Sequence, residues 1–173
     1  MWQGIDIADM ANRAAYGSNS LLDLGCGTGQ SSSLFTIPAK VGVDGFEKYS
    51  FEYIKNSGGE FVKGDLRKIS EMFPSKTFDT VVAWDVIEHL IKDEGIKLLT
   101  DMERIAIKQV IVFTPFGMYE QNDDPLGENN EFNIHRSGWM PEDFLRRFFD
   151  VAILKNYFKV NGQDAIFANK RVG

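Results

Sequence analysis

The chain has 173 residues, of which 43% are hydrophobic and 25% charged, the composition of one ordinary globular domain that can bury a sheet core. Its net charge is −6 without a basic run, which argues against DNA or long RNA as substrate, because phosphate contacts supply most non-specific nucleic-acid affinity. The single cysteine excludes an internal disulfide and a cysteine-rich zinc site.

The first predicted strand leads into the most informative turn of the chain. An apolar run with Asp23 inside it ends at Leu24 and breaks into glycines at 25, 27 and 29. Glycines permit positive φ and remove Cβ atoms that would keep a ligand from the backbone. The residues from Gln30 onward begin a helix whose free N–H groups would face that ligand. Strand, turn and helix together predict a nucleotide-cofactor site in a doubly wound α/β sheet.

The spacing of this turn restricts the cofactor. Gln30 stands where a dinucleotide fingerprint needs its third glycine, and the Gly-Lys-Ser/Thr of a phosphate-binding loop is missing from the chain. The next apolar run, from Val41 to Val43, ends at Asp44. A carboxylate at that strand end is placed to accept hydrogen bonds from two ribose hydroxyls.

At this point the sequence resembles the class I S-adenosylmethionine-dependent methyltransferases. The segment LDLGCGTG is close to the commonest form of that family's first motif. Four further segments resemble the later motifs in order, namely 41–44, 64–66, 78–85 and 110–115.

Apolar runs and helix-like segments alternate along the chain, which predicts a mostly parallel sheet covered on both faces. We expect strands at 20–24, 40–44, 60–63, 78–83, 109–113, 151–157 and 164–169. We expect helices at 6–15, 29–35, 47–56, 66–72, 93–106 and 141–148, with an apolar stripe in the fifth that includes Ile96. The predicted fold is one Rossmann-like, seven-stranded methyltransferase domain over residues 1–173, and the resemblance implies an antiparallel last strand.

Residues 114–140 form a long irregular stretch with embedded aromatic side chains. Loops of this length in compact domains are usually functional or disordered, and the aromatic residues among turn formers favour function. The segment after the fifth strand covers the acceptor pocket in the family, so we interpret this loop as substrate-binding. A surface loop anchored by its aromatic residues is the alternative.

The resemblance implies a set of cofactor-binding residues. They are Asp23, Gly25, Cys26 and Gly27 for the aminoacyl part, Asp44 for the ribose, Gly45, Phe46, Asp65 and Leu66 around the adenine, and Trp84 near the methionine moiety. Asp23 and Asp65 have a structural alternative as caps of the turns that follow them. Phe46 has the alternative of packing, and the Cys26 thiol is expected to be inert.

Both histidines of the chain are candidates for catalysis. Asp85, Glu88 and His89 would share one face if their segment were helical. A metal-assisted subset of the family carries Glu-x-x-Glu-His at this place, and two carboxylates with an imidazole could bind a divalent ion. Many metal-free relatives carry the same Glu-His pair, so we predict no metal. His135, inside the long loop, suits a general base, or with Trp139 it pins the loop to the sheet.

The predicted function is methyl transfer from S-adenosylmethionine to a small-molecule acceptor at oxygen or nitrogen, with S-adenosylhomocysteine as product. The alternatives are a non-catalytic or partner-dependent subunit that binds the donor, a nucleotide-dependent oxidoreductase, and an RNA methyltransferase. We expect neither DNA binding nor membrane insertion, and a homodimer stays open. Residues 1–6 lack the features of a signal peptide, so a cytoplasmic location is expected.

Overall fold

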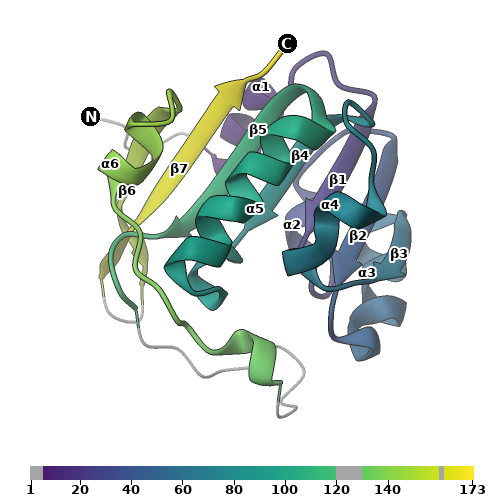
Figure 1. The fold of residues 1–173 in the computed structure, drawn as a ribbon, viewed down its shortest axis with the longest axis horizontal. Coiled ribbons are helices and arrows are strands. Elements are labelled where there is room, and N and C mark those ends of the chain that lie inside the picture. The colour runs from purple at the N-terminus through teal and green to yellow at the C-terminus, as the bar shows by residue number, and fades with distance from the viewer. Residues whose placement is uncertain (1–5, 120–129, 160–161) are drawn as a thin grey trace.

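The computed structural model describes residues 6–119, 130–159 and 162–173. Seven strands form a single sheet in the order β3-β2-β1-β4-β5-β7-β6 (Figure 1). The strands are β1 (Ser20–Leu24), β2 (Ala39–Asp44), β3 (Glu60–Lys63), β4 (Phe78–Trp84), β5 (Ala106–Pro115), β6 (Asp150–Phe158) and β7 (Gln163–Arg171). β1 to β5 pair in parallel, and β7 runs antiparallel between β5 and β6. The predicted seven-stranded sheet with an antiparallel last strand is therefore confirmed.

Except for the fifth, which keeps its predicted length, the helices are shorter than the sequence pattern indicates. They are α1 (Ile7–Ala14), α2 (Gln30–Ser33), α3 (Ser50–Ser57), α4 (Ile69–Met72), α5 (Lys92–Ile105) and α6 (Pro141–Leu145), with 3₁₀ turns η1 (Glu47–Tyr49), η2 (Leu66–Lys68), η3 (Ile87–His89) and η4 (Glu131–Asn133). The segments predicted as single helices at 47–56 and 66–72 each begin with a 3₁₀ turn.

The end of α5 and one of its side chains differ from the prediction. The helix ends at Ile105, and Ala106, whose amide still donates to the Met102 carbonyl, already belongs to β5 and pairs with Phe78 of β4. Ile96, assigned to the apolar stripe, is 41% exposed. The buried face of α5 consists of residues such as Leu98, Leu99 and Met102.

Side chains alternate between two hydrophobic cores, one on each face of the sheet. Val81 and Ala83 of β4 join the core beneath α5, whereas Val82 and Trp84 join the core that includes Ala11 of α1. This period of two is expected for a strand buried on both faces. Figure 1 shows α5 lying along β4 and β5 on the near face, with α1 behind the sheet.

The carboxyl ends of the parallel strands lie along one edge of the sheet. β1 lies between β2 and β4. The strand order therefore runs outward from β1 in one direction through β2 and β3, and in the other direction through β4 and β5. In open α/β sheets this switch point is where ligands bind. The ends of β1, β2 and β4 therefore position the site described below.

Part of the long stretch after β5 is fixed against the sheet. Phe116 and Gly117 form bridges to Trp139, whose side chain is fully buried. Residues 120–129 of the predicted substrate loop, and residues 1–5 on which the signal-peptide prediction depends, lie outside the described residues. Within the described ranges, no helix has both the length and the apolar character needed to cross a membrane.

Candidate active site

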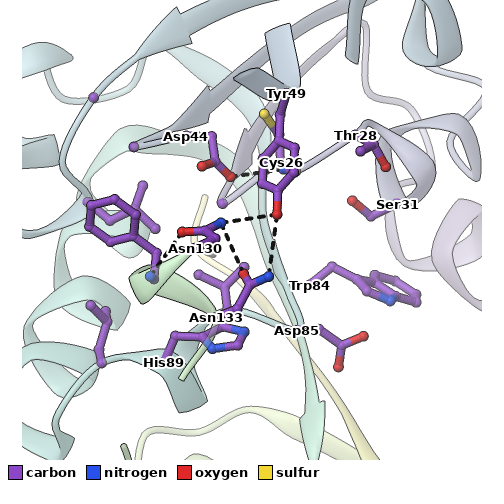
Figure 2. A pocket seen from close by; sticks show the side chains of 18 of the residues that line it. Cys26, Thr28, Ser31, Asp44, Tyr49, Trp84, Asp85, His89, Asn130 and Asn133 are labelled. Carbon is purple, nitrogen blue, oxygen red and sulfur yellow. Dashed lines mark hydrogen bonds between the residues drawn. The ribbon is translucent and has the colours of Figure 1, made fainter. Parts of the chain in front are cut away.

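One cavity of about 1140 Å³ follows the carboxyl edge of the sheet (Figure 2). We call the part around Gly27 and Asp44 the donor end, and the part around Asp85 and His89 the acceptor end. Ten predicted residues line it: Gly25, Cys26, Gly27, Asp44, Gly45, Asp65, Leu66, Trp84, Asp85 and His89. Four other predicted residues are not among those that line it: Asp23, Phe46, Glu88 and His135.

The glycine turn is held by the neighbouring strand. The amides of Gly25 and Cys26 donate to the Val43 carbonyl at 2.8 and 3.1 Å. Gly25 and Gly27 have φ of +67° and +48°, which favour glycine. A Cβ on Gly25 would lie 2.5 Å from Val86, whereas a Cβ on Gly27 would meet nothing within 4 Å. Gly27 therefore leaves room in the cavity that a side chain would fill.

Asp44 connects the end of β2 to this turn. Its carboxylate accepts hydrogen bonds from the Gly27 amide at 3.0 Å and the Phe46 amide at 2.8 Å. The Phe46 ring packs edge-on against Tyr49, with centroids 5.0 Å apart. This contact is of the kind expected if Phe46 serves for packing and not for ligand binding. The residues at the donor end fit a nucleoside with ribose hydroxyls, since Asp44 stands at the strand end beside the space that Gly27 leaves.

Asp23 lies beneath the turn. Its Oδ2 accepts from the hydroxyls of Ser31 at 3.0 Å and Ser32 at 2.6 Å, and so it fixes the start of α2. Burial raises the pKa of this carboxyl to about 6, against the two serine hydrogen bonds. Burial also raises the pKa of the Cys26 thiol, which keeps it protonated and unreactive.

Asp65 makes the contacts of a cap. Its side chain accepts from the Arg67 amide at 3.0 Å and forms a two-pronged ion pair with the Arg67 guanidinium. The Arg67 side-chain hydrogen bond is the main cause that lowers the pKa of Asp65. Asp65 and Leu66 also line the cavity, so the capping role of Asp65 does not remove either residue from the surface that a ligand could contact.

Trp84 and Asp85 mark the passage from the donor end to the acceptor end. The Trp84 ring stacks on Phe113 with centroids 4.6 Å apart. Asp85 has φ of +51°, a conformation that costs energy for a residue with a side chain and is concentrated at functional sites. Its Oδ1 is buried and has no partner among the described residues. Burial raises the pKa of Asp85 to about 7.

The segment after Asp85 differs from the helical arrangement that the sequence analysis assumed. Only residues 87–89 form a 3₁₀ turn, and the left-handed backbone of Asp85 breaks the shared face of Asp85, Glu88 and His89. Within the described ranges, the group that could hold a divalent cation is Glu88, His89 and His135, whose ligand atoms lie within 4.8 Å of one another.

The two histidines lie together at the acceptor end. Their ring centroids are 4.7 Å apart, and His135 Nδ1 lies 2.5 Å from the Tyr119 carbonyl. That contact assigns the proton to Nδ1 and leaves Nε2 as an acceptor. Burial, with the neighbouring His135, lowers the pKa of His89 to about 4, and burial lowers the pKa of His135. Both imidazoles are therefore neutral at pH 7.

The segment that contains His135 is fixed to η3. The amides of Arg136 and Ser137 both donate to the Glu88 carbonyl, at 2.7 and 3.0 Å. The Glu88 carboxylate accepts from the Thr114 hydroxyl at 2.8 Å, and its other oxygen is buried without a described partner. Burial and the nearby Asp85 raise the pKa of Glu88.

Several cavity residues were missed by the sequence analysis. They are Tyr49, Asn130, Phe132, Asn133, Arg136 and Tyr157. These residues come from η1, the segment after β5, and β6, and they belong to no recognisable motif. A signal was present only for the segment after β5, which was already interpreted as functional.

The sequence from residue 22 to 114 matches the model of a methyltransferase domain family. This chain belongs to that family. The match confirms the predicted resemblance to the S-adenosylmethionine-dependent methyltransferases. It also confirms the predictions that the protein is a methyltransferase and that its cofactor is S-adenosylmethionine. No curated protein sequence matches the chain significantly.

Solved structures of low sequence identity share the fold of this methyltransferase. An S-adenosylmethionine-dependent methyltransferase from Methanosarcina mazei has a TM-score of 0.71 and 12% identity, with 96% of this chain and 98% of that chain covered. One from Archaeoglobus fulgidus has a TM-score of 0.64 and 20% identity, with 91% and 89% covered. An amino pentose methyltransferase from Micromonospora echinaspora, solved with S-adenosylmethionine bound, has a TM-score of 0.61 and 16% identity, with 95% and 88% covered.

Proposed function

We propose that this methyltransferase carries a methyl group from S-adenosylmethionine, held at the donor end, to the oxygen or nitrogen of a small molecule at the acceptor end. The observation that supports this most directly is the continuous cavity, which joins the Gly27–Asp44 wall to Asp85 and His89. Its volume of about 1140 Å³ leaves space for a second small molecule beside a nucleoside-sized ligand, because single-ligand pockets span roughly 300–1,000 Å³.

The donor end would bind and orient S-adenosylmethionine. The Asp44 carboxylate would accept from the ribose hydroxyls, and the backbone at Gly25 and Gly27 would lie against the aminoacyl part. The bound donor supplies an electrophilic methyl group, so the protein contributes mainly proximity and orientation. These two effects are worth roughly 7–11 kcal/mol in well-aligned reactions.

The acceptor end would orient the nucleophile and receive its proton. Asp85 is at the cavity wall with an unpartnered buried oxygen, and a group with a pKa near the working pH is the best matched general base. His89, also in the wall, stays neutral but is a weaker base because its pKa is about 4. His135 lies behind His89, where it would position that ring. The catalytic assignment of the two histidines stays a prediction.

Calorimetric titration with S-adenosylmethionine and S-adenosylhomocysteine tests the donor end. Asp44→Ala should weaken binding at least tenfold, since buried hydrogen bonds to a charged group contribute about 1.5–3 kcal/mol. Glu47→Ala is the matched control, because this carboxylate is exposed and pairs with Lys63 at the surface. Absence of binding by the unmodified protein would refute the proposed function.

A screen of small amines and hydroxyl compounds with labelled donor then tests the acceptor end. Transfer of label to any of them separates an enzyme from a subunit that only binds the donor. The other predictions stay open: no DNA substrate, a homodimer, a metal-free reaction and a cytoplasmic location.

A further inference from the structure

Residues 130–133, which include η4, cross the donor end of the cavity; we call them the strap. The side chains of Asn130, Phe132 and Asn133 line the same cavity as Asp44 and Gly45. The Phe132 ring lies 3.3 Å from the position that a Cβ on Gly45 would occupy. A ring from the segment after β5 therefore packs beside the residue that follows the proposed ribose ligand.

The strap is fixed by the hydroxyl of one tyrosine. Asn130 Nδ2 donates to Tyr49 Oη at 3.0 Å, and Asn133 Nδ2 donates to the same oxygen at 3.3 Å. Figure 2 shows both amides pointing toward this hydroxyl. Tyr49 is 3% exposed and its ring packs edge-on against Phe46, so the strap attaches to a side chain that is itself buried.

The strap also has internal order. Asn130 Oδ1 accepts from the Phe132 amide at 3.0 Å, and the Asn130 carbonyl accepts from the Asn133 amide at 3.1 Å. Asn130 is thus held at both ends of its side-chain amide, and it is 7% exposed. Phe132, by contrast, is 44% exposed, so its ring contributes little to the core and is available to cover a ligand.

We propose that Tyr49 is a positioning residue that holds the strap across the donor end, where Phe132 and Asn130 retain the nucleoside part of the methyl donor. This inference rests on the proposed function, since it assumes that the donor binds beside Asp44. The strap lies on the nucleoside side because its contacts are with Gly45 and Tyr49.

The dissociation rate of S-adenosylhomocysteine is the measurement that tests the strap. Tyr49→Phe removes the acceptor of both amide hydrogen bonds and keeps the ring, and Phe132→Ala removes the covering ring. Each variant should raise the dissociation rate about three- to tenfold, in proportion to one or two lost contacts. Adenosine, which lacks the amino-acid part, should lose affinity by the same factor as S-adenosylhomocysteine.

Two matched controls separate this effect from general destabilisation. Tyr16→Phe changes a tyrosine that is 80% exposed, and Phe148→Ala changes a phenylalanine that is 86% exposed; both should leave the rates unchanged. Because Phe132 is partly exposed, Phe132→Ala reports on the strap even where Tyr49→Phe fails to fold.

The outcomes distinguish the two proposals. If the unmodified protein binds S-adenosylhomocysteine and Asp44→Ala abolishes binding, but Phe132→Ala and Tyr49→Phe leave the dissociation rate within twofold, the strap inference is overturned and the function stands. A loss confined to the melting temperature, with rates unchanged, overturns it equally. If the unmodified protein binds no donor, the proposed function itself fails.

Discussion

The two ends of the cavity are built in different ways. At the donor end, backbone groups and one strand-end carboxylate make the surface: the Gly25 and Cys26 amides bond to Val43, and the Gly27 amide bonds to Asp44. At the acceptor end, buried side chains from distant segments make it, and Asp85, Glu88 and His89 each keep a polar atom without a described partner. The wall at Gly27 and Asp44 is built from the ends of two adjacent strands, whereas the acceptor end, like the strap that crosses the donor end, depends on side chains that tertiary packing brings together.

The largest expected effect concerns the anchor of the acceptor end. Trp139 is fully buried, lies under the Lys92 ammonium at 3.8 Å and donates to the Ser137 hydroxyl at 3.0 Å. Trp139→Ala should lower the free energy of unfolding by about 3–5 kcal/mol, measured by urea denaturation. Phe148→Ala, at an exposed ring, should change it by less than about 0.5 kcal/mol.

The same variant sharpens the comparison of the two ends. Where Trp139→Ala remains folded, its affinity for S-adenosylhomocysteine should stay within about threefold, because no donor-end contact involves Trp139. A large loss of affinity would show that the two ends of the cavity are energetically coupled.

A second prediction separates two glycines of the donor turn. Gly25→Ala should cost about 2–4 kcal/mol of stability, since its Cβ would meet Val86 at 2.5 Å and its φ is positive. Gly27→Ala should cost only about 1 kcal/mol, for its positive φ, because nothing lies within 4 Å. It should nevertheless weaken donor binding more than tenfold by filling the cavity.

Urea denaturation and calorimetry on the two variants check this prediction. Gly17→Ala is the control for backbone strain alone, with φ of +78° and open space around it. Equal stability losses at Gly25 and Gly17 would contradict the packing argument.

The third prediction concerns pH. Burial raises the pKa of Asp85 to about 7 and of Asp23 to about 6, from 3.8. At these two groups the folded state holds protons that the unfolded state has released, so their contribution to stability is present at low pH and is lost as pH rises from about 4 to 7. His89 acts in the opposite sense, because its lowered pKa of about 4 makes the folded state less stable as pH falls below about 6.5. Urea denaturation should show a loss on the order of 2 kcal/mol between pH 5 and 8.

Asp85→Asn tests the origin of this loss, because an amide of similar shape cannot release a proton. The variant should flatten the pH dependence and be more stable than the unmodified protein at pH 8. A profile that rises with pH in both proteins would refute the assignment.

The smallest expected effect is that of divalent cations. The predicted metal-free reaction implies that EDTA, Mg²⁺ or Mn²⁺ leaves the melting temperature unchanged within about 1 °C. Donor affinity should not change either, because the donor end shares no residue with Glu88, His89 and His135. A shift with Mn²⁺ that His135→Ala abolishes would place a cation at the acceptor end and contradict the prediction.

The predicted site residues divide along the same line. Gly25, Gly27 and Asp44, which line the cavity, could be predicted from sequence because neighbouring residues specify backbone conformation and strand ends. Tyr49, Asn130 and Tyr157 carry no such signal, since they reach the cavity only through packing. The shared face considered for Asp85, Glu88 and His89 depended on helical spacing, which the positive φ of Asp85 does not allow.

The sequence by itself determined the sheet, its strands and the donor turn, because alternating apolar runs and glycines act through local periodicity and backbone freedom. Only the tertiary structure decided that His135 joins Glu88 and His89, and that Asn130 reaches Tyr49, 81 residues away. Such contacts are selected by the shape of the packed core, and no local pattern encodes them.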